Sequence, residues 1–228
     1  MKSQLTLKTL ALLFSLIFSA FLFAPPAAAM PVTSEAAQSS YQIYLPLVVN
    51  GATGGMTPAA PQMPSSEAFI ASVADGQAGV VRGVYVPGVL ALPVRQQPAD
   101  NPTYVSPEAG TATQFASAAA LGVTGLLAHN YLAGAEFFKL AAGQDVLVVY
   151  GDGAVKLYRV TAIYRYQALD PYSPYSNFVD LSTGEMKSVG EVFTQVYAGG
   201  DHVTFQTCIA NNGNPSWGRL FVIATPVN

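Results

Sequence analysis

Cys208 is the only cysteine among 228 residues, and it ends a strand-like run at residues 203–208. Arg219 opens a second apolar run at residues 219–224, and His129 ends a third. A thiol, an imidazole and a guanidinium are the groups that acyl transfer through a cysteine nucleophile requires. An arginine beside a thiol lowers the thiol pKa and stabilises an oxyanion. These three residues are therefore the candidate catalytic groups.

Only one of the two histidines can serve Cys208. If residues 202–208 form one extended strand, six steps of ~3.3 Å place the Cα atoms of His202 and Cys208 ~20 Å apart. His129 is then the expected imidazole partner of the thiol. The alternative for His129 is a hydrogen-bonded structural histidine at the junction of a strand and a loop, since histidine serves both purposes.

Cys208 and Arg219 also have alternatives without catalysis. A lone cysteine in an exported protein cannot form an internal disulfide, so it is a buried inert thiol, an intermolecular link or a nucleophile. Arg219 could be a charge at the rim of a sheet. However, residues 211–215 are a strong turn signal, which would return the chain antiparallel and bring Arg219 towards the cysteine strand. This convergence favours the active-site interpretation.

Residues 1–29 are predicted to be a signal peptide or an N-terminal membrane anchor. Two lysines precede an apolar run at residues 10–24, and small residues at 27–29 would allow cleavage before Met30. The alternative is an uncleaved anchor, because residues 9–29 are long enough to cross ~30 Å of hydrocarbon. Either outcome predicts an extracytoplasmic protein, at the cell surface or secreted.

The net charge of the chain limits its possible binding partners, and its composition separates a spacer from a folded domain. Without the two lysines of the leader, eight basic residues remain against thirteen acidic ones, a net charge of −5. Nucleic acid binding needs a basic footprint and is excluded on this ground. Residues 30–78 are rich in Pro, Ala and Gly and are predicted to be a spacer. Residues 79–228 are predicted to form the folded domain.

The domain is dominated by strand patterns separated by turn signals. We expect a mainly β fold, an eight-stranded antiparallel barrel with one or two short helices. Strands are expected at residues 80–86, 89–94, 122–129, 145–150, 154–166, 203–208 and 219–224. Helical segments are candidates at residues 65–73, 111–120, 133–142 and 189–197. The last of these lies in a long connection, residues 167–200, and connections of that length are usually functional.

The order His129, then Thr204-Phe205-Gln206-Thr207-Cys208, then Arg219 resembles the sortase transpeptidases. Their signature is Thr-Leu-x-Thr-Cys, with an arginine on the next strand and a histidine far upstream. Residues 83–87, 127–130 and 143–148 look like the first strand, the histidine segment and the Gly-Asp-x-Val strand opening of that family. The resemblance covers residues 79–228. Departures from the pattern are Phe205 for Leu, Ala128 for Gly and an inserted Gln144.

The resemblance implies a cysteine transpeptidase that acts on secreted proteins bearing an LPxTG-type sorting signal. Cys208 would form a thioacyl-enzyme, His129 would act as general acid and base, and Arg219 would hold the oxyanion. Thr207 and Thr204 would contribute to substrate binding. An amine nucleophile on the cell wall or on a pilin would release the product. No metal and no cofactor are expected, because the acidic residues lack the spacing of a calcium loop.

Other function classes remain as alternatives. A sortase-like peptidase that mainly hydrolyses would use the same residues, because water can replace the amine. A non-catalytic exported β-barrel binding module would keep Cys208 as a structural thiol. An L,D-transpeptidase is disfavoured because the cysteine follows Gln206-Thr207. Papain-like enzymes are excluded, since they place the cysteine before the histidine.

Overall fold

The structure, a computed structural model, describes residues 62–227 with the exception of Pro174. The predicted leader and most of the predicted spacer, residues 1–61, lie outside this range, and the choice between signal and anchor stays a prediction. No helix in the described part of the chain is long and apolar enough to span a membrane.

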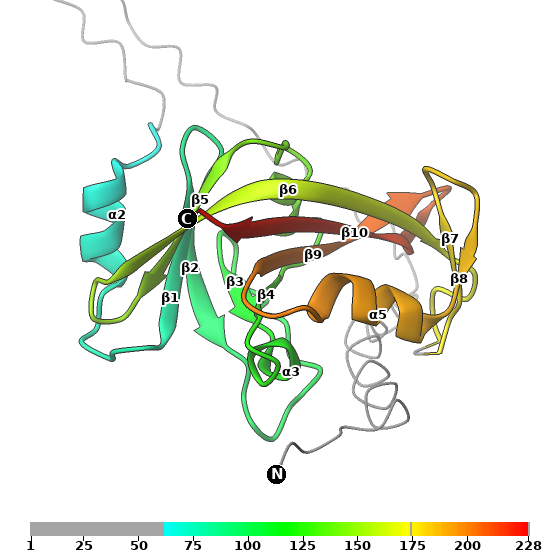
Figure 1. Cartoon of the computed structure of the whole chain (residues 1–228), viewed down its shortest axis with the longest axis horizontal. Coiled ribbons are helices and arrows are strands. Elements are labelled where there is room, and N and C mark those ends of the chain that lie inside the picture. Colours follow the sequence, from blue (N-terminus) through cyan, green and yellow to red (C-terminus); the bar gives the residue numbers. More distant parts are fainter. Residues whose placement is uncertain (1–61, 174, 228) are drawn as a thin grey trace, which may run out of the picture. The chain divides into compact units, whose positions relative to one another are not determined.

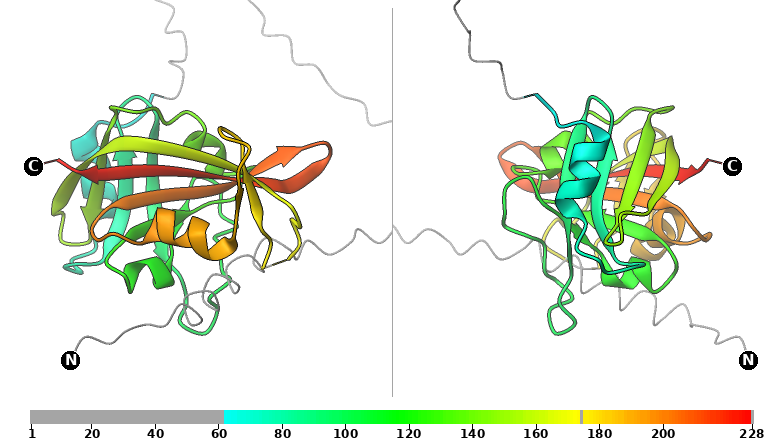
Figure 2. Two further views of the ribbon diagram at one scale, coloured as in Figure 1. Left: turned by 45° about the vertical axis from the view of Figure 1, so that its right-hand side comes forward. Right: turned by 90° about the vertical axis from the view of Figure 1, so that its left-hand side faces the viewer.

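Eight strands close into a barrel, and two more extend it beyond β6 (Figures 1 and 2). The order around the barrel is β10-β9-β4-β3-β2-β1-β5-β6, and β6 pairs back with β10; β7 and β8 continue from β6. The strands are β1 Val81–Val86, β2 Leu90–Gln96, β3 Ala112–Gln114, β4 Thr124–Leu127, β5 Asp145–Tyr150, β6 Val155–Ala168, β7 Phe178–Asp180, β8 Met186–Lys187, β9 Val203–Asn211 and β10 Asn214–Pro226.

The predicted mainly β, eight-stranded barrel is confirmed, but its sheet is mixed rather than antiparallel throughout. Strand β3 runs parallel to β2, and β9 runs parallel to β4. Parallel neighbours need a crossover connection of a dozen or more residues. The loop at residues 97–111 and the long excursion from β4 to β9 supply these crossovers.

Four helices occur in residues 62–227, against the one or two that were expected. They are α2 Ser66–Val73, α3 Ala116–Ala119, α4 Gly134–Phe137 and α5 Val189–Tyr197. The prediction for α5 is confirmed, because Ser188 and Glu191 form a capping box that fixes its start. The helix expected at residues 133–142 is only one turn long. The segment at residues 111–120 is partly wrong, since it begins with a strand that pairs with both β2 and β4.

Helix α2 lies within the range assigned to the spacer, yet it is part of the folded unit. Ser65 caps its start by accepting a hydrogen bond from the amide of Ala68 at 3.2 Å. Phe69 is buried and packs on Tyr85 of β1 at a ring-centroid distance of 5.7 Å. A β-carbon on Gly83 would lie 2.8 Å from the Phe69 ring, so a glycine is needed there.

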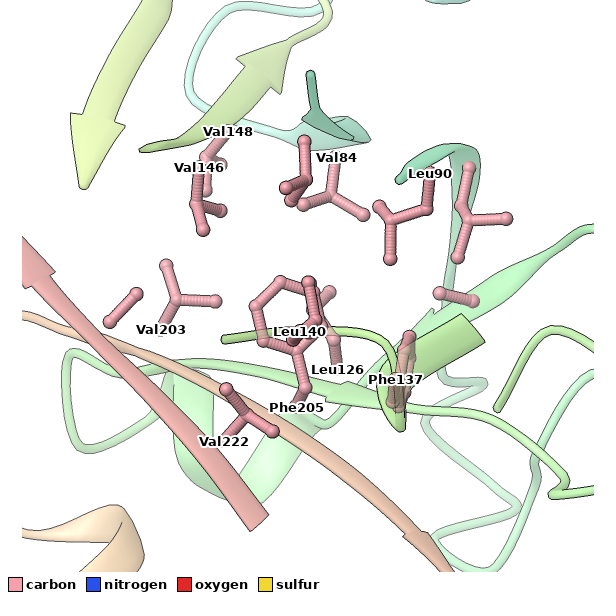
Figure 3. Packing of buried hydrophobic residues seen from close by; sticks show 14 of the residues in the cluster. Val84, Leu90, Leu126, Phe137, Leu140, Val146, Val148, Val203, Phe205 and Val222 are labelled. Carbon is pink, nitrogen blue, oxygen red and sulfur yellow. The ribbon is translucent and has the colours of Figure 1, made fainter. Parts of the chain in front are cut away.

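The alternation of side chains along β9 and β10 divides the core into two clusters. Val203 and Phe205 of β9 point into the barrel, where Val84, Leu126 and other aliphatic residues meet them (Figure 3). Side chains on the opposite face meet α5 and form a second cluster. Each fully buried side chain of this size contributes about 1.5–3 kcal/mol to folding. Two packed faces therefore hold β9 firmly in register.

Candidate active site

Cys208 and Arg219 are direct cross-strand neighbours in the β9–β10 ladder. Such antiparallel partners emerge on one face of a sheet with Cβ atoms ~4.5–5.5 Å apart. The tight turn between the strands uses Asn212 at φ 50° and Gly213 at φ 76°. This left-handed backbone is what an Asn-Gly turn supplies, so the turn predicted at residues 211–215 does bring Arg219 back to the cysteine strand.

The segment that carries His129 lies on the other side of β9 from Arg219. Leu127 pairs with Gln206 in the parallel β4–β9 ladder, and the amide of Ala128 donates to the Gln206 carbonyl at 3.2 Å. β4 ends at Leu127, and this register, if continued by two residues, would bring His129 level with Cys208. The structure therefore pairs the thiol with the guanidinium across β9 and β10, and it places the segment that leads into His129 on the other side of β9.

Cys208 and Arg219 lie on the outer face of the barrel, the face on which α5 packs. Thr204 and Gln206 share the face of Cys208, and both bond to α5: Thr204 donates to the Val196 carbonyl at 2.6 Å, and the Tyr197 hydroxyl donates to the Gln206 side chain. Figures 1 and 2 show α5 running alongside β9. These bonds fix the strand that carries the thiol against a helix, not only against its neighbouring strands.

The Cys208 thiol is almost completely covered, with 2% of the residue exposed. Burial raises its pKa above the usual range, while the charge of Arg219 and a hydrogen bond with the Ser216 side chain oppose that rise. The thiol is therefore neutral at neutral pH in this structure. Two neighbouring groups nevertheless favour its ionised form.

Arg219 is fully buried, which excludes the alternative of a charge at the rim of the sheet. Its Nη1 donates to the backbone carbonyls of Ser216 and Gly218, each at 2.8 Å. Burial lowers its pKa, and attraction to ionised Cys208 opposes that change. Because arginine starts from a pKa above 12, it stays charged. A buried, permanently positive group therefore faces the sulfur.

His129 is half-buried at the end of β4. Burial lowers its pKa, and a hydrogen bond with the backbone of Val105 opposes this effect. The ring of Tyr131 stacks on the imidazole at a centroid distance of 5.2 Å and an angle of 22°. The histidine is thus held by the β2–β3 loop on one side and by an aromatic ring on another, and both contacts restrict the orientation of the imidazole.

Thr207 faces away from Cys208, because adjacent strand residues point to opposite faces. Its hydroxyl is buried and donates to the Ala128 carbonyl at 2.8 Å. Thr204 is equally buried and bonded to α5. The predicted substrate-binding roles of both threonines remain predictions. The contacts that the structure shows instead hold the histidine segment and the helix to β9.

The turn after His129 depends on a glycine that the sequence analysis missed. The amide of Gly134 donates to the His129 carbonyl at 2.9 Å. A β-carbon on Gly134 would lie 2.3 Å from the Thr207 hydroxyl oxygen and 2.7 Å from the carbonyl oxygens of Ala128 and His129. Backbone atoms cannot give way as a flexible side chain can, so only glycine allows this turn to close against β9.

We expect Gly134→Ala to destabilise the protein by roughly 1–3 kcal/mol, because overpacking forces the histidine turn off β9. Gly190→Ala is the matched control. Gly190 lies in α5 with nothing within 4 Å of its would-be β-carbon, so alanine there should stabilise the helix by about 0.5–1 kcal/mol. Urea denaturation measures both changes. Equal stability of Gly134→Ala and wild type would contradict the packing argument.

His202 has a structural role and is no partner of the thiol. β9 begins at Val203, one residue after His202, and its strand from Val203 to Cys208 separates this histidine from the thiol along the chain. Its ring nitrogens lie 2.8 Å from the Gly200 carbonyl and 3.0 Å from the Val196 carbonyl. This histidine joins the end of α5 to the start of β9.

The acidic residues of the long connection serve local structure. Asp180 accepts hydrogen bonds from the amide and hydroxyl of Ser182, and Glu191 completes the capping box of α5. Within residues 62–227, no three His, Cys, Asp or Glu side chains are grouped so that they could hold a metal ion.

Two polar residues at the site were also missed by the sequence analysis. Ser216 is buried in the β9–β10 hairpin and opposes the rise of the Cys208 pKa, and the Asn130 side chain donates to the Pro215 carbonyl at 2.9 Å, which ties the histidine segment to that hairpin. Asn130 directly follows the candidate histidine, which is a usable signal. Ser216 has no such signal in the sequence, and it lies in the irregular part of the β9–β10 ladder between Asn214 and Gly218.

No family model and no curated protein matches the chain. Several solved structures are similar to it. Sortase A of Listeria monocytogenes is 16% identical over 65% of this chain and 88% of that chain, with a TM-score of 0.41. Sortase C-1 of Actinomyces oris is 15% identical over 73% and 83%, with a TM-score of 0.44. Sortase E1 of Streptomyces coelicolor, solved with a tripeptide in its active site, is 19% identical over 68% and 91%, with a TM-score of 0.42. All three are sortases, and the likeness is one of fold.

Proposed function

We propose that this chain is a sortase-like cysteine transpeptidase that cleaves an LPxTG-type sorting signal and transfers the acyl part to an amine. The observation that carries the proposal is the direct cross-strand pairing of Cys208 with the fully buried Arg219, next to the strand whose end leads into His129. A nucleophile, a proton carrier and a buried positive charge are what acyl transfer requires.

In the first half-reaction, the ionised sulfur of Cys208 attacks the scissile carbonyl carbon, and the carbonyl oxygen takes up the negative charge. The guanidinium of Arg219 stabilises that oxyanion. The carbon–nitrogen bond then breaks, protonated His129 gives its proton to the leaving amine, and a thioester to Cys208 remains.

In the second half-reaction, an incoming amine attacks the thioester carbonyl, and neutral His129 accepts its proton. The carbon–sulfur bond breaks, and the sulfur leaves as a thiolate. The products are a new amide and an enzyme with its thiolate–imidazolium pair restored. Water in place of the amine would give hydrolysis by the same steps.

The two pKa directions limit how much of the enzyme is active before substrate binds. Burial raises the pKa of Cys208 and lowers that of His129, so both favour the neutral thiol and imidazole at neutral pH. The thiolate–imidazolium pair is therefore a minor form. Since Cys208 is only 2% exposed, a bound peptide must also displace the groups that cover it.

The proposed partners follow from the chemistry and the leader. The acyl donor is a secreted protein with a sorting signal, and the acceptor is an amine on the cell wall or on a pilin. An extracytoplasmic location, with residues 9–29 as a candidate anchor, agrees with the apolar leader.

The rival class is a non-catalytic exported barrel in which Cys208 is inert. One observation favours it, namely the burial that raises the thiol pKa. An inert thiol gives no reason for a fully buried arginine as the cross-strand neighbour of the cysteine, because the burial of a guanidinium is costly.

The test is mass spectrometry of the full chain after incubation with LPxTG-like peptides and small primary amines. We expect a thioacyl adduct and a peptide product in which the amine replaces the leaving segment. Cleavage without exchange would identify a hydrolase that uses the same residues. The absence of both adduct and cleavage, with a thiol inert to alkylation, would support the non-catalytic barrel.

A further inference from the structure

Tyr131 is an exposed aromatic residue whose ring lies against the imidazole of His129. The two ring centroids are 5.2 Å apart and the ring planes differ by 22°, so the rings are stacked. The tyrosine is 72% exposed, whereas the histidine under it is half-buried. The hydrophobic core therefore gains little from Tyr131, and the contact with the imidazole is the interaction that its position serves.

The turn that carries Tyr131 is fixed on both sides of this residue. The His129 carbonyl accepts hydrogen bonds from the amides of Leu132 and Gly134, each at 2.9 Å. The Asn130 side chain donates to the Pro215 carbonyl at 2.9 Å and so holds the turn to the β9–β10 hairpin. These three bonds do not involve the tyrosine side chain. Replacing the ring therefore removes the stack and leaves the bonds of the turn in place.

The stack favours one protonation state of the imidazole. The face of an aromatic ring carries partial negative charge and attracts a cation within about 6 Å of its centroid. Imidazole is neutral or positive near neutral pH, and only the positive form gains from this attraction. Burial acts in the opposite direction and lowers the His129 pKa. The exposed tyrosine thus offsets part of the effect of burial on the half-buried histidine.

We propose that Tyr131 is a positioning residue that holds the His129 imidazole under its ring and favours the imidazolium. Protonated His129 is the form that gives its proton to the leaving amine in the proposed first half-reaction. Tyr131 exchanges no proton with substrate and acts only through the histidine. The inference rests on the proposed function, because it assigns a role in the same proton transfer.

The elements beside His129 carry other charged and titratable groups, which substitution of Tyr131 leaves unchanged. On β9, β10, the β2–β3 loop and α4 these groups are Cys208, Arg219, Asp100, Tyr104, Glu108 and Glu136. Glu108 is paired with Arg95 at 3.1 Å, and Glu136 with Lys139 at 2.7 Å. Burial raises the pKa of Cys208, so its thiol stays neutral while the imidazole titrates. A difference between variants at position 131 therefore reports the ring itself.

The experiment is the pH titration of the imidazole Cε1 protons in the full chain, followed by NMR. The chain has two histidines, so two signals are expected, and His129→Gln assigns them. Tyr131→Phe keeps the aromatic face and should keep the wild-type midpoint of His129. Tyr131→Leu keeps an apolar cover without a ring and should lower that midpoint by about half a pH unit, which is roughly threefold less imidazolium above the midpoint.

Two references protect the test against a folding artefact. Tyr172→Leu is the matched control, because Tyr172 is also an exposed tyrosine, 58% exposed in the connection between β6 and β7, and its loss should leave both midpoints unchanged. The His202 signal is the internal reference, since this ring lies between the carbonyls of Gly200 and Val196 and should titrate alike in every variant at position 131. Circular dichroism spectra would establish that each variant is folded.

The outcomes separate this inference from the proposed function. We expect a lower His129 midpoint in Tyr131→Leu alone, together with about threefold lower kcat/KM for acyl transfer at neutral pH, which Tyr131→Phe should not show. Equal His129 midpoints for the Leu and Phe variants, with a thioacyl adduct formed by wild type, would overturn the role of Tyr131 alone. A wild-type protein that forms no adduct would overturn the proposed function, and the role of Tyr131 in proton transfer with it.

Discussion

Cys208→Ala is expected to abolish the thioacyl adduct and to lower the rate of peptide cleavage by ~10⁴-fold or more. Cys208 is the only thiol in the chain, so no second sulfur can take its place. The free energy of unfolding should change by only about 1 kcal/mol, because the substitution removes a single small group. Intact-mass spectrometry with the best sorting peptide measures the adduct directly.

Cys208→Ser is the matched control for this loss. It keeps the size of the side chain and substitutes a hydroxyl, which ionises far less readily than a thiol, so it should be almost as inactive as alanine. An adduct formed by Cys208→Ala at a rate within tenfold of wild type would assign the nucleophile to another residue. The mechanism proposed above would then be wrong.

Arg219→Ala is expected to lower the rate of acyl transfer by about 10²–10³-fold, the usual loss when an oxyanion-stabilising group is removed. It should also destabilise the protein by about 1–3 kcal/mol, because the carbonyls of Ser216 and Gly218 lose a buried donor. Measuring kcat/KM well below the melting temperature of the variant separates the two effects.

Two control variants show whether the effect of Arg219 on the rate depends on its guanidinium geometry and position or only on its positive charge. Arg219→Lys should not restore the rate, since an ammonium cannot reproduce the planar fork that bonds two carbonyls. Arg159→Ala removes a half-exposed arginine paired with Asp145 and should cost less than about 1 kcal/mol with little change in rate. A fully active Arg219→Ala would contradict the assigned role of this guanidinium.

The candidate site follows from sheet register. One cross-strand pair joins Cys208 to Arg219, and the parallel β4–β9 ladder brings the segment that leads into His129 alongside β9. Packing on both faces of β9 prevents a slip of one residue, which would turn the thiol to the barrel interior. Precision in the site therefore comes from the same hydrophobic burial that stabilises the fold.

Local patterns predicted most strands, because apolar runs bounded by turn residues are visible in the sequence. They predicted α5 to the residue, since its capping box lies within four positions. They missed β3, a strand of three residues whose hydrogen bonds go to β2 and β4, both distant along the chain. Short elements that are stabilised only by neighbours leave no local pattern.

Local patterns also could not reveal which way site side chains point. Thr207 precedes the cysteine, and strand alternation turns it to the opposite face, where it bonds to Ala128. Ser216 lies where the β9–β10 ladder is irregular, between Asn214 and Gly218. Such irregularities re-aim single side chains, and they depend on how the hairpin meets the histidine segment.

The sequence by itself determined the chemistry that is available and the order of the elements. A single cysteine, two histidines and an arginine after a turn limit the choice of groups, and periodicity places them on strands. Only the tertiary structure decided the parallel pairing of β4 with β9, the complete burial of Arg219, and the contacts of Gly134 and Ser216. The physical reason is the sequence distance over which each kind of interaction acts. Propensity and periodicity act over a few residues, whereas burial, register and pKa depend on groups that the chain brings together from far apart.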